Sequence, residues 1–343
     1  GSKTGALRTG VVGDPLIRGL GYASGRLYKL SNELYNYKWP ADPLTIHGQK
    51  RIASELNITP DPQKWILLDE GAQGVVYKVK KVGITYALKL AKNPGSLTDE
   101  IVTLKALKGI TGVIDYIDNN YNLALLLEYI DGDNLHTYSI ENTEFNNKSL
   151  HDRNIEILEI TLKILKILEE IHDADWIHRD IKLGNIMYTK SKQIKIIDFG
   201  KALKIGDFFN RLRNGKASLT CCTKLYYSPL ACSRWPHEGY DHSDMKKNDL
   251  WSLGLSVGEL SIKRRLYDKR RDYREYTPLL EMLCEPVFLK DQINLYKEDI
   301  EEYITSVMDL LMDMEGDLDY EKIYKQIDDS KNKAKEIVAE IEG

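Results

Sequence analysis

Four groups of chemically capable residues follow one another along this 343-residue chain. In order, they are Gly71-Ala72-Gln73-Gly74, Lys89, His178-Arg179-Asp180-Ile181-Lys182-Leu183-Gly184-Asn185 and Asp198-Phe199-Gly200. Glycine has no Cβ, so a backbone that contains two glycines can approach a bound group closely. A lysine supplies a point positive charge, and carboxylate and amide oxygens are the hard donors that Mg²⁺ requires. These residue types suit a site for an anion held together with a divalent cation.

The surrounding residues predict which elements position these groups. Strands are expected at Trp65–Leu68, Val75–Val79, Ile84–Leu90, Gly112–Ile117 and Leu123–Glu128. Gly71 and Gly74 then lie in a hairpin turn, Lys89 lies on the third strand, and Asp198 follows the apolar run 194–197. Three of the four groups therefore have an element that could hold them in place.

Helical patterns fill most of the remaining chain. Ser96 and Asp99 have the spacing of a capping box, before a helix expected at Glu100–Leu107. An apolar stripe at helical spacing, which we interpret as core, consists of Ile155, Leu158, Leu162, Leu165 and Leu168. The first 60 residues are irregular, with short helices expected at Gly25–Tyr37 and His47–Leu56. A small β-rich part followed by a larger helical part predicts an α+β fold with two lobes and a ligand site at their junction.

The four groups, in this order and on these elements, resemble the eukaryotic-type (Hanks-type) serine/threonine protein kinase family over roughly residues 65–315. The resemblance implies the two-lobed kinase fold, with a small antiparallel β-sheet lobe carrying one helix and a larger, mainly helical lobe. We expect an N-terminal extension over residues 1–60, the N-lobe over 61–130, and the C-lobe with a helical C-terminal end over 131–343. The implied activity is transfer of the γ-phosphoryl group of ATP, with Mg²⁺, to a protein hydroxyl.

The resemblance also implies roles for the catalytic residues. Lys89 would contact the phosphates and pair with Glu100, with Asp99 as the alternative partner. Asp180 would be the catalytic base, and Lys182 would contact the transferring phosphate. The two Mg²⁺ ligands would be Asn185 and Asp198. His178 is expected to be a packed histidine that bonds to backbone, and Asp249 is expected to anchor the catalytic loop.

The same resemblance implies a nucleotide pocket. Gly71 and Gly74 would cover the phosphates, and the backbone of Glu128 and Ile130 would pair with adenine. Apolar walls around the ring would come from Val76, Ala87 and Leu127. Lys182 and Thr223, which lies six residues before Pro229, match the serine/threonine form of the family.

The chain departs from the family pattern at two places. Asp69 replaces the first glycine of the Gly-rich loop, for which we expect reduced ATP affinity at most. Leu230 replaces the glutamate of Ala-Pro-Glu, which makes the mode of substrate binding an open question. The segment between Asp198 and Pro229 is basic, so autophosphorylation at Ser218 or Thr220 could be read by Arg179. The alternative is a solvated basic loop without a switch.

Composition excludes several other classes. The formal net charge is −4, which argues against a nucleic-acid partner, and no apolar run is long enough to span a membrane. Four cysteines are too few for a disulfide framework, and the vicinal Cys221-Cys222 pair makes zinc binding with Cys232 and His237 an unfavoured alternative. We expect a cytoplasmic protein, in the host cytoplasm if the Lys-, Ile-, Asn- and Tyr-rich composition reflects a viral or pathogen source. A pseudokinase or binding scaffold, and a small-molecule or lipid kinase, remain alternative functions.

Overall fold

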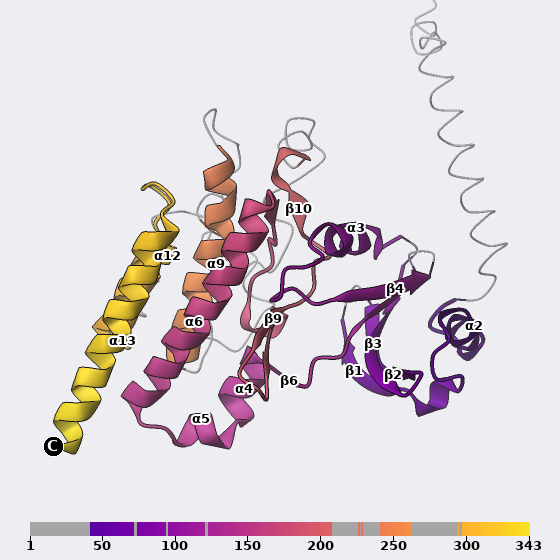
Figure 1. Cartoon of the computed structure of the whole chain (residues 1–343), viewed down its shortest axis with the longest axis horizontal. Helices are drawn as coiled ribbons and strands as arrows, with labels where there is room; N and C mark the ends of the chain where they lie inside the picture. The colour runs from indigo at the N-terminus through magenta and orange to yellow at the C-terminus, as the bar shows by residue number, and fades with distance from the viewer. Residues whose placement is uncertain are drawn as a thin grey trace, which may run out of the picture.

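The computed structural model describes residues 42–71, 74–93, 95–120, 123–207, 226, 228, 241–262, 294 and 297–343. An antiparallel sheet with two helices, α2 (Ile46–Leu56) and α3 (Thr98–Ala106), precedes a larger helical part (Figure 1). In spatial order, the five strands of the sheet are β1 (Ile66–Glu70), β2 (Gly74–Lys81), β3 (Ile84–Ala91), β5 (Ala124–Glu128) and β4 (Tyr116–Asn120). The predicted α+β fold with a small sheet lobe and a larger helical lobe is therefore confirmed.

The sheet buries apolar side chains on both faces. Side chains alternate along a strand, so Ala87 on β3 faces the opposite way from Leu88 and Leu90. Ala87 joins the large core that continues into the helical part, whereas Leu88 and Leu90 join a separate cluster on the outer face. Lys89 shares the inner face with Ala87 and is thereby directed toward the helical part.

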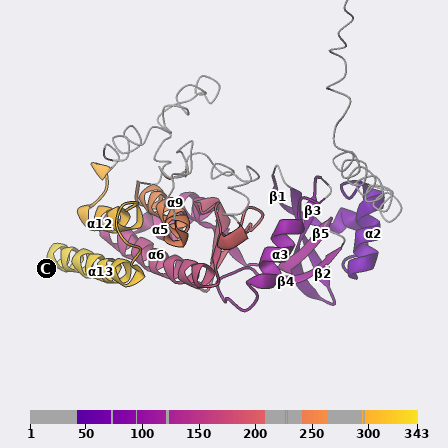
Figure 2. The same ribbon diagram turned by 90° about the horizontal axis from the view of Figure 1, so that it is seen from above.

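Helix α2 (Ile46–Leu56) covers the outer face of this sheet. Its buried residues Ile52, Ala53 and Leu56 belong to the same cluster as Leu88 and Leu90. Figure 2 shows α2 at the end of the sheet that lies away from the helical part. The helix predicted at His47–Leu56 is confirmed, and the one predicted at Gly25–Tyr37 lies outside the described residues. A 3-10 turn, η2 (Pro62–Lys64), connects this region to β1.

The predicted capping box at Ser96 and Asp99, before the helix expected at Glu100–Leu107, is wrong. Helix α3 spans Thr98–Ala106, and its N-cap position is Leu97, which makes no side-chain capping bond. Ser96 Oγ is buried without a hydrogen-bond partner. The side chain of Leu97 is fully buried, so apolar packing fixes the start of this helix.

The strand predicted at Gly112–Ile117 is also misplaced. β4 begins only at Tyr116, and residues 112–114 instead pair with β9 (Ile194–Ile196) of the helical part. Ile196 N donates to Gly112 O at 2.7 Å, and Ile114 N donates to Ile196 O at 3.1 Å. Residues 112–117 thus contribute to two sheets. Residues 112–114 bond to β9 of the helical lobe, and Tyr116 begins β4 of the sheet lobe.

The helical part is built around α6. Its helices are α4 (Leu135–Glu141), α5 (Thr143–Asn147), α6 (Leu150–Asp173), α9 (His242–Ile262), α12 (Glu302–Leu311) and α13 (Tyr320–Glu342). Helix α6 contacts both α9 and α13, and α13 runs along it (Figure 1). No helix in the described ranges has the length and apolar character needed to cross a membrane.

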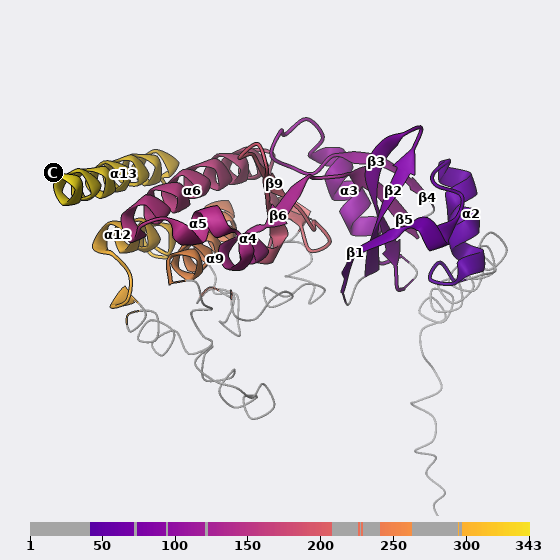
Figure 3. The ribbon, with the colours of Figure 1, turned by 90° about the horizontal axis from the view of Figure 1, so that it is seen from below.

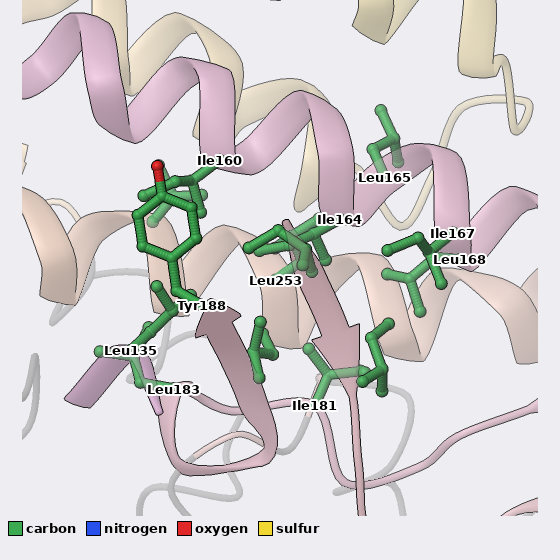
Figure 4. Close-up of a cluster of buried hydrophobic side chains, with 14 of the residues drawn as sticks. Leu135, Ile160, Ile164, Leu165, Ile167, Leu168, Ile181, Leu183, Tyr188 and Leu253 are labelled. Atoms are coloured by element: carbon green, nitrogen blue, oxygen red, sulfur yellow. The ribbon is translucent and has the colours of Figure 1, made fainter. Parts of the chain in front are cut away.

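The buried surface of α6 is wider than the predicted stripe. Leu158, Leu165 and Leu168 are fully buried, but Ile155 and Leu162 are only half-buried. Figure 4 shows a second set of α6 side chains, Ile160, Ile164 and Ile167, in the same core. Because α6 has helices on more than one side, a single helical stripe underestimates its core.

Short strands present the polar loops between the lobes. A three-stranded sheet contains β6 (Gly132–Asn134), β8 (Ile186–Thr189) and β9, and a second ribbon pairs β7 (Trp176–Ile177) with β10 (Leu203–Lys204). Figure 3 shows β6 and β9 between the helices and the larger sheet. Residues 178–185, which end in the turn η3 (Leu183–Asn185), connect β7 to β8, and Asp198 follows β9.

Candidate functional site

A buried ion pair connects β3 to α3. Lys89 Nζ lies 2.6 Å from Glu100 Oε2 and 3.4 Å from Asp198 Oδ1. The side chains of Lys89 and Glu100 are 10% and 2% exposed, whereas Asp99 lies on the surface. Burial opposes the charged amine, but the charges of Glu100 and Asp198 raise the pKa of Lys89 above its usual value. The structure therefore brings Glu100, and not Asp99, to a lysine that stays protonated.

Asp198 reaches this pair from the end of β9 in a left-handed backbone conformation, with φ of 61°. The next residue, Phe199, is fully buried, and its ring meets the His178 ring edge-on at a centroid distance of 4.7 Å. The Phe199 N–H also bonds to the Glu100 carboxylate. Burial opposes ionisation of Asp198, but the charge of Lys89 holds the pKa of this carboxyl below its usual value. An ionised carboxylate, 34% exposed, is thus fixed between the lobes.

The loop after β7 gathers three more predicted residues. Asp180 Oδ2 lies 3.3 Å from Lys182 Nζ and accepts a hydrogen bond from Asn185 Nδ2 at 3.1 Å. The same Nδ2 donates to the Asp180 backbone oxygen at 2.8 Å. Ile197 N donates to Asn185 O at 3.0 Å, which holds this loop beside the residue that precedes Asp198. Asp180, Asn185 and Asp198 are consequently neighbours at the lobe junction.

Asp249 on α9 fixes the backbone of this loop. Its Oδ2 accepts from the His178 N–H and its Oδ1 from the Arg179 N–H, each at 2.8 Å. His178 is fully buried, and its Nε2 bonds to the Ile197 carbonyl at 2.9 Å. The predictions that Asp249 anchors the loop and that His178 packs and bonds to backbone are confirmed by these contacts.

The donor atoms fit a magnesium ion. Asn185 uses its nitrogen on Asp180, so the oxygen is the atom of that amide suited to a cation. With a carboxylate oxygen of Asp198, it forms a pair of hard donors, and Mg²⁺ commonly takes its other ligands from substrate phosphates and water. Within the described ranges, no cluster of three or more His, Cys, Asp or Glu offers a different metal site. The candidate zinc ligands Cys221, Cys222, Cys232 and His237 lie outside those ranges.

The two loop glycines have different surroundings. Gly71 N donates to Gly74 O at 3.0 Å, which closes the turn between β1 and β2. A Cβ on Gly74 would lie 2.3 Å from the Leu90 carbonyl oxygen, while a Cβ on Gly71 would meet nothing within 4 Å. Asp69 Oδ1 accepts from the Glu70 N–H at 2.9 Å, so this carboxylate is held by its own strand.

The predicted adenine walls lie together on the inner face of the sheet. Ala87 and Leu127 are direct partners in the β3–β5 ladder, and both are buried. Val76 and Ile130 are half-buried against the same core. The Glu128 N–H donates to Asp115 O at 3.0 Å and is thereby already engaged.

A contact that the sequence analysis did not predict joins the two lobes at Glu128. Its Oε1 accepts from Lys195 Nζ at 2.7 Å and from the Asp115 N–H at 2.8 Å. Lys195 lies on β9, two residues before Ile197, and its position in an apolar strand was its only local signal. This pair therefore lies next to the segments that carry Leu127 and Asp198.

Two residues that follow Asp198 in the chain, Tyr226 and Ser228, make hydrogen bonds to α9. Ser228 is buried and bonds through Oγ to Asn248, and Tyr226 OH donates to Glu259 Oε2 at 2.5 Å. Ser252 Oγ donates to the Tyr226 carbonyl at 3.0 Å. Other residues named from the sequence, Ser218, Thr220, Thr223 and Leu230, lie outside the described ranges.

Comparison with known proteins gives a consistent match. The family described as "Protein kinase domain" matches residues 66–339, well over half of the chain. Mitogen-activated protein kinase kinase 7 of Arabidopsis thaliana is 27% identical over 256 residues, which cover 66% of this chain and 75% of that protein. Serine/threonine-protein kinase pakG of Dictyostelium discoideum is 29% identical over 57% of this chain, and serine/threonine-protein kinase 10 of Danio rerio is 26% identical over 71%. The matched regions span only 16% and 24% of the lengths of these last two relatives.

Proposed function

Because the chain belongs to the protein kinase family, we propose that it transfers the γ-phosphoryl group of ATP to serine or threonine hydroxyls of a protein. The observation that carries the proposal is the meeting of the Lys89–Glu100 pair with Asp198 beside the Asp180–Asn185 loop. In this family, the lysine–glutamate pair and the aspartate that binds Mg²⁺ must both be in place for transfer. Lys182, and the serine/threonine kinases among the relatives, support the choice of acceptor.

The inner face of the sheet would bind the nucleotide. Val76, Ala87 and Leu127 supply apolar surface for the adenine ring, and the Ile130 N–H with the Glu128 carbonyl would pair with its edge. Gly71 and Gly74 would lie over the phosphates, where backbone can approach without a Cβ. The protonated Lys89 would neutralise part of the phosphate charge while Glu100 fixes its position.

Asn185 and Asp198 would hold Mg²⁺, which supplies neutralisation of the charge on the phosphate oxygens when it is bound. Asp180 would orient the acceptor hydroxyl and accept its proton late in the transfer. The Lys182 ammonium, 3.3 Å from Asp180 Oδ2, would place a positive charge next to the group that is transferred.

The proposed division of the chain is an extension over 1–60, an N-lobe over 61–130 and a C-lobe over 131–343. Since α2 packs on the sheet, the end of the extension would move together with the N-lobe. Autophosphorylation at Ser218 or Thr220, with Arg179 as the reader, is part of the same proposal.

The test is transfer of radiolabelled phosphate from ATP to peptide libraries with serine, threonine or tyrosine acceptors. Asp180→Asn should lower turnover by roughly 10²- to 10⁴-fold while ATP binding persists, because only the transfer step needs the carboxylate. Asp328→Asn, on the exposed side of α13, is the matched control and should behave as wild type. Mass spectrometry of the incubated protein would locate any autophosphorylated residue.

Two results would contradict the proposal. ATP binding without transfer to any acceptor by the wild-type protein would indicate a binding scaffold. Transfer to lipids or small molecules, with no phosphorylation of peptides or of the protein itself, would indicate a kinase of a different class.

A further inference from the structure

A chain of hydrogen bonds runs from helix α13 to the backbone of the catalytic loop. Tyr320 OH, at the start of α13, bonds to Nδ1 of His172 near the end of α6. His172 Nε2 bonds to Asp249 Oδ2 at 2.9 Å. Asp249 in turn accepts the N–H groups of His178 and Arg179, each at 2.8 Å. Three successive hydrogen bonds therefore connect the Tyr320 side chain of α13 to the loop that carries Asp180.

The protonation of this chain follows from its members. Burial opposes ionisation of Asp249, but hydrogen bonds from His172 and the His178 backbone hold the pKa of its carboxyl below the usual value. An ionised carboxylate only accepts, so His172 must donate through Nε2–H. In a neutral imidazole, Nδ1 is then an acceptor, which requires a donor from Tyr320. Burial, together with the charge of Asp249, raises the pKa of Tyr320, so the phenol keeps the proton that it donates.

On the basis of the proposed function, we propose that Tyr320 is a positioning residue for phosphoryl transfer, whose hydroxyl holds His172 in the Nε2–H tautomer. The bond that one ring nitrogen makes decides which nitrogen carries the proton. Without the Tyr320 donor, His172 would be free to place its proton on Nδ1 and to present a lone pair to Asp249. Asp249 would then lose the donor that helps to align it with the two loop amides, and the position of Asp180 would become less defined.

Tyr324 provides a matched control. It lies one turn further along α13, and its hydroxyl donates to Glu169 of α6. The contact joins the same two helices as the Tyr320 contact and uses the same donor group. Glu169 acts on Tyr320 only through its charge and makes none of the hydrogen bonds that lead to Asp249, so Tyr324→Phe should remove a comparable contact and leave the bonds to the loop in place.

The experiment combines spectroscopy of histidine with kinetics on the full chain. In ¹⁵N-histidine spectra of the wild type, with His172 assigned among the seven histidines by a His172→Gln variant, we expect a protonated Nε2 and an unprotonated Nδ1. Tyr320→Phe should give a mixture of tautomers and faster hydrogen exchange at the amides of His178 and Arg179. It should lower kcat by roughly three- to tenfold, the worth of one buried hydrogen bond, with KM for ATP almost unchanged. Tyr324→Phe should leave all of these values at the wild-type level.

A wild-type His172 that carries its proton on Nδ1 would overturn the inference, and this result requires no variant. The inference also fails if Tyr320→Phe leaves the tautomer and the exchange of the loop amides unchanged, or if Tyr324→Phe changes them equally. Absence of phosphoryl transfer in the wild type would contradict the proposed function instead, because the tautomer and amide exchange are measured without turnover.

Discussion

At the scale of single residues, the two glycines of one loop do different work. Gly74 lies against the β3 backbone so closely that a Cβ would overlap the Leu90 carbonyl oxygen at 2.3 Å. Gly71 has open space where its Cβ would be. Gly74 is therefore required by the packing of the sheet, whereas Gly71 leaves open space beside the loop where a ligand could bind.

Alanine substitutions should separate these roles. Gly74→Ala should lower the free energy of unfolding by about 1–3 kcal/mol, since the strands must move apart to admit the methyl group. Gly71→Ala should leave stability unchanged, because its methyl group would meet no atom within 4 Å, and should raise KM for ATP if the phosphates bind under this loop as proposed. Urea unfolding and ATP titration of the kinase assay measure the two effects. Equal loss of stability in both variants would show that this distinction is incorrect.

Residues in short motifs could be predicted from the sequence, but their distant partners could not. Lys89, Asp180, Asn185 and Asp198 were identifiable because each belongs to a local pattern that also sets its element. The Lys195–Glu128 contact joins residues 67 positions apart, and the Tyr320–His172 contact spans 148 positions. Such contacts depend on how elements pack, and no local pattern encodes that packing.

At the scale of elements, the periodicity of the sequence predicted that a helix or strand exists more reliably than it predicted where that element begins. The strand at Ile84–Leu90 and the helix at His47–Leu56 were close to β3 and α2. The strand at Gly112–Ile117 was misplaced because hydrophobicity alone does not show that residues 112–114 pair with β9. Burial of Leu97 likewise outweighs the polar capping signal before α3.

Helix α2 should contribute to stability through its packing on the sheet. Ile52 is fully buried against the outer face, whereas Ile46 on the same helix is 49% exposed. Ile52→Ala should cost about 2–5 kcal/mol of unfolding free energy, because it removes buried surface and leaves a cavity. Ile46→Ala should change stability by no more than about 0.5 kcal/mol. Chemical denaturation of both variants tests this, and similar values for the two would argue against α2 as an integral layer.

At the scale of the whole molecule, the two lobes share one seam. Residues 112–114 pair with β9, the Glu128–Lys195 contact lies beside them, and one apolar core continues from the sheet into the helices. Gly112 rests against α6 so tightly that a Cβ would lie 2.2 Å from Ile167. The segment that delivers Asp198 is thus bound to both lobes.

The Lys195–Glu128 contact should stabilise this seam. Lys195→Met should lower the free energy of unfolding by about 1 kcal/mol, because a half-buried carboxylate loses a charged donor. Lys190→Met breaks the exposed ion pair with Asp131, whose atoms are 3.1 Å apart. This variant should change the free energy of unfolding by less than about 0.5 kcal/mol. Thermal and urea unfolding compare the two variants. An equal loss of unfolding free energy in both would mean that the Lys195–Glu128 contact does not stabilise the junction of the lobes.

The ladder between residues 112–114 and β9 gives the molecule a property that its chain connectivity hides. Residues 129–131 form the covalent connection from β5 of the sheet lobe to β6 of the helical lobe. The main-chain hydrogen bonds at Gly112, Ile114 and Ile196 join the two lobes independently of this connection. Cleavage of the polypeptide there would leave those main-chain bonds in place, and of residues 129–131 it is Ile130 that packs against the common core. The sheet-bearing and helix-bearing halves consequently hold complementary surfaces through which separately produced fragments could recombine.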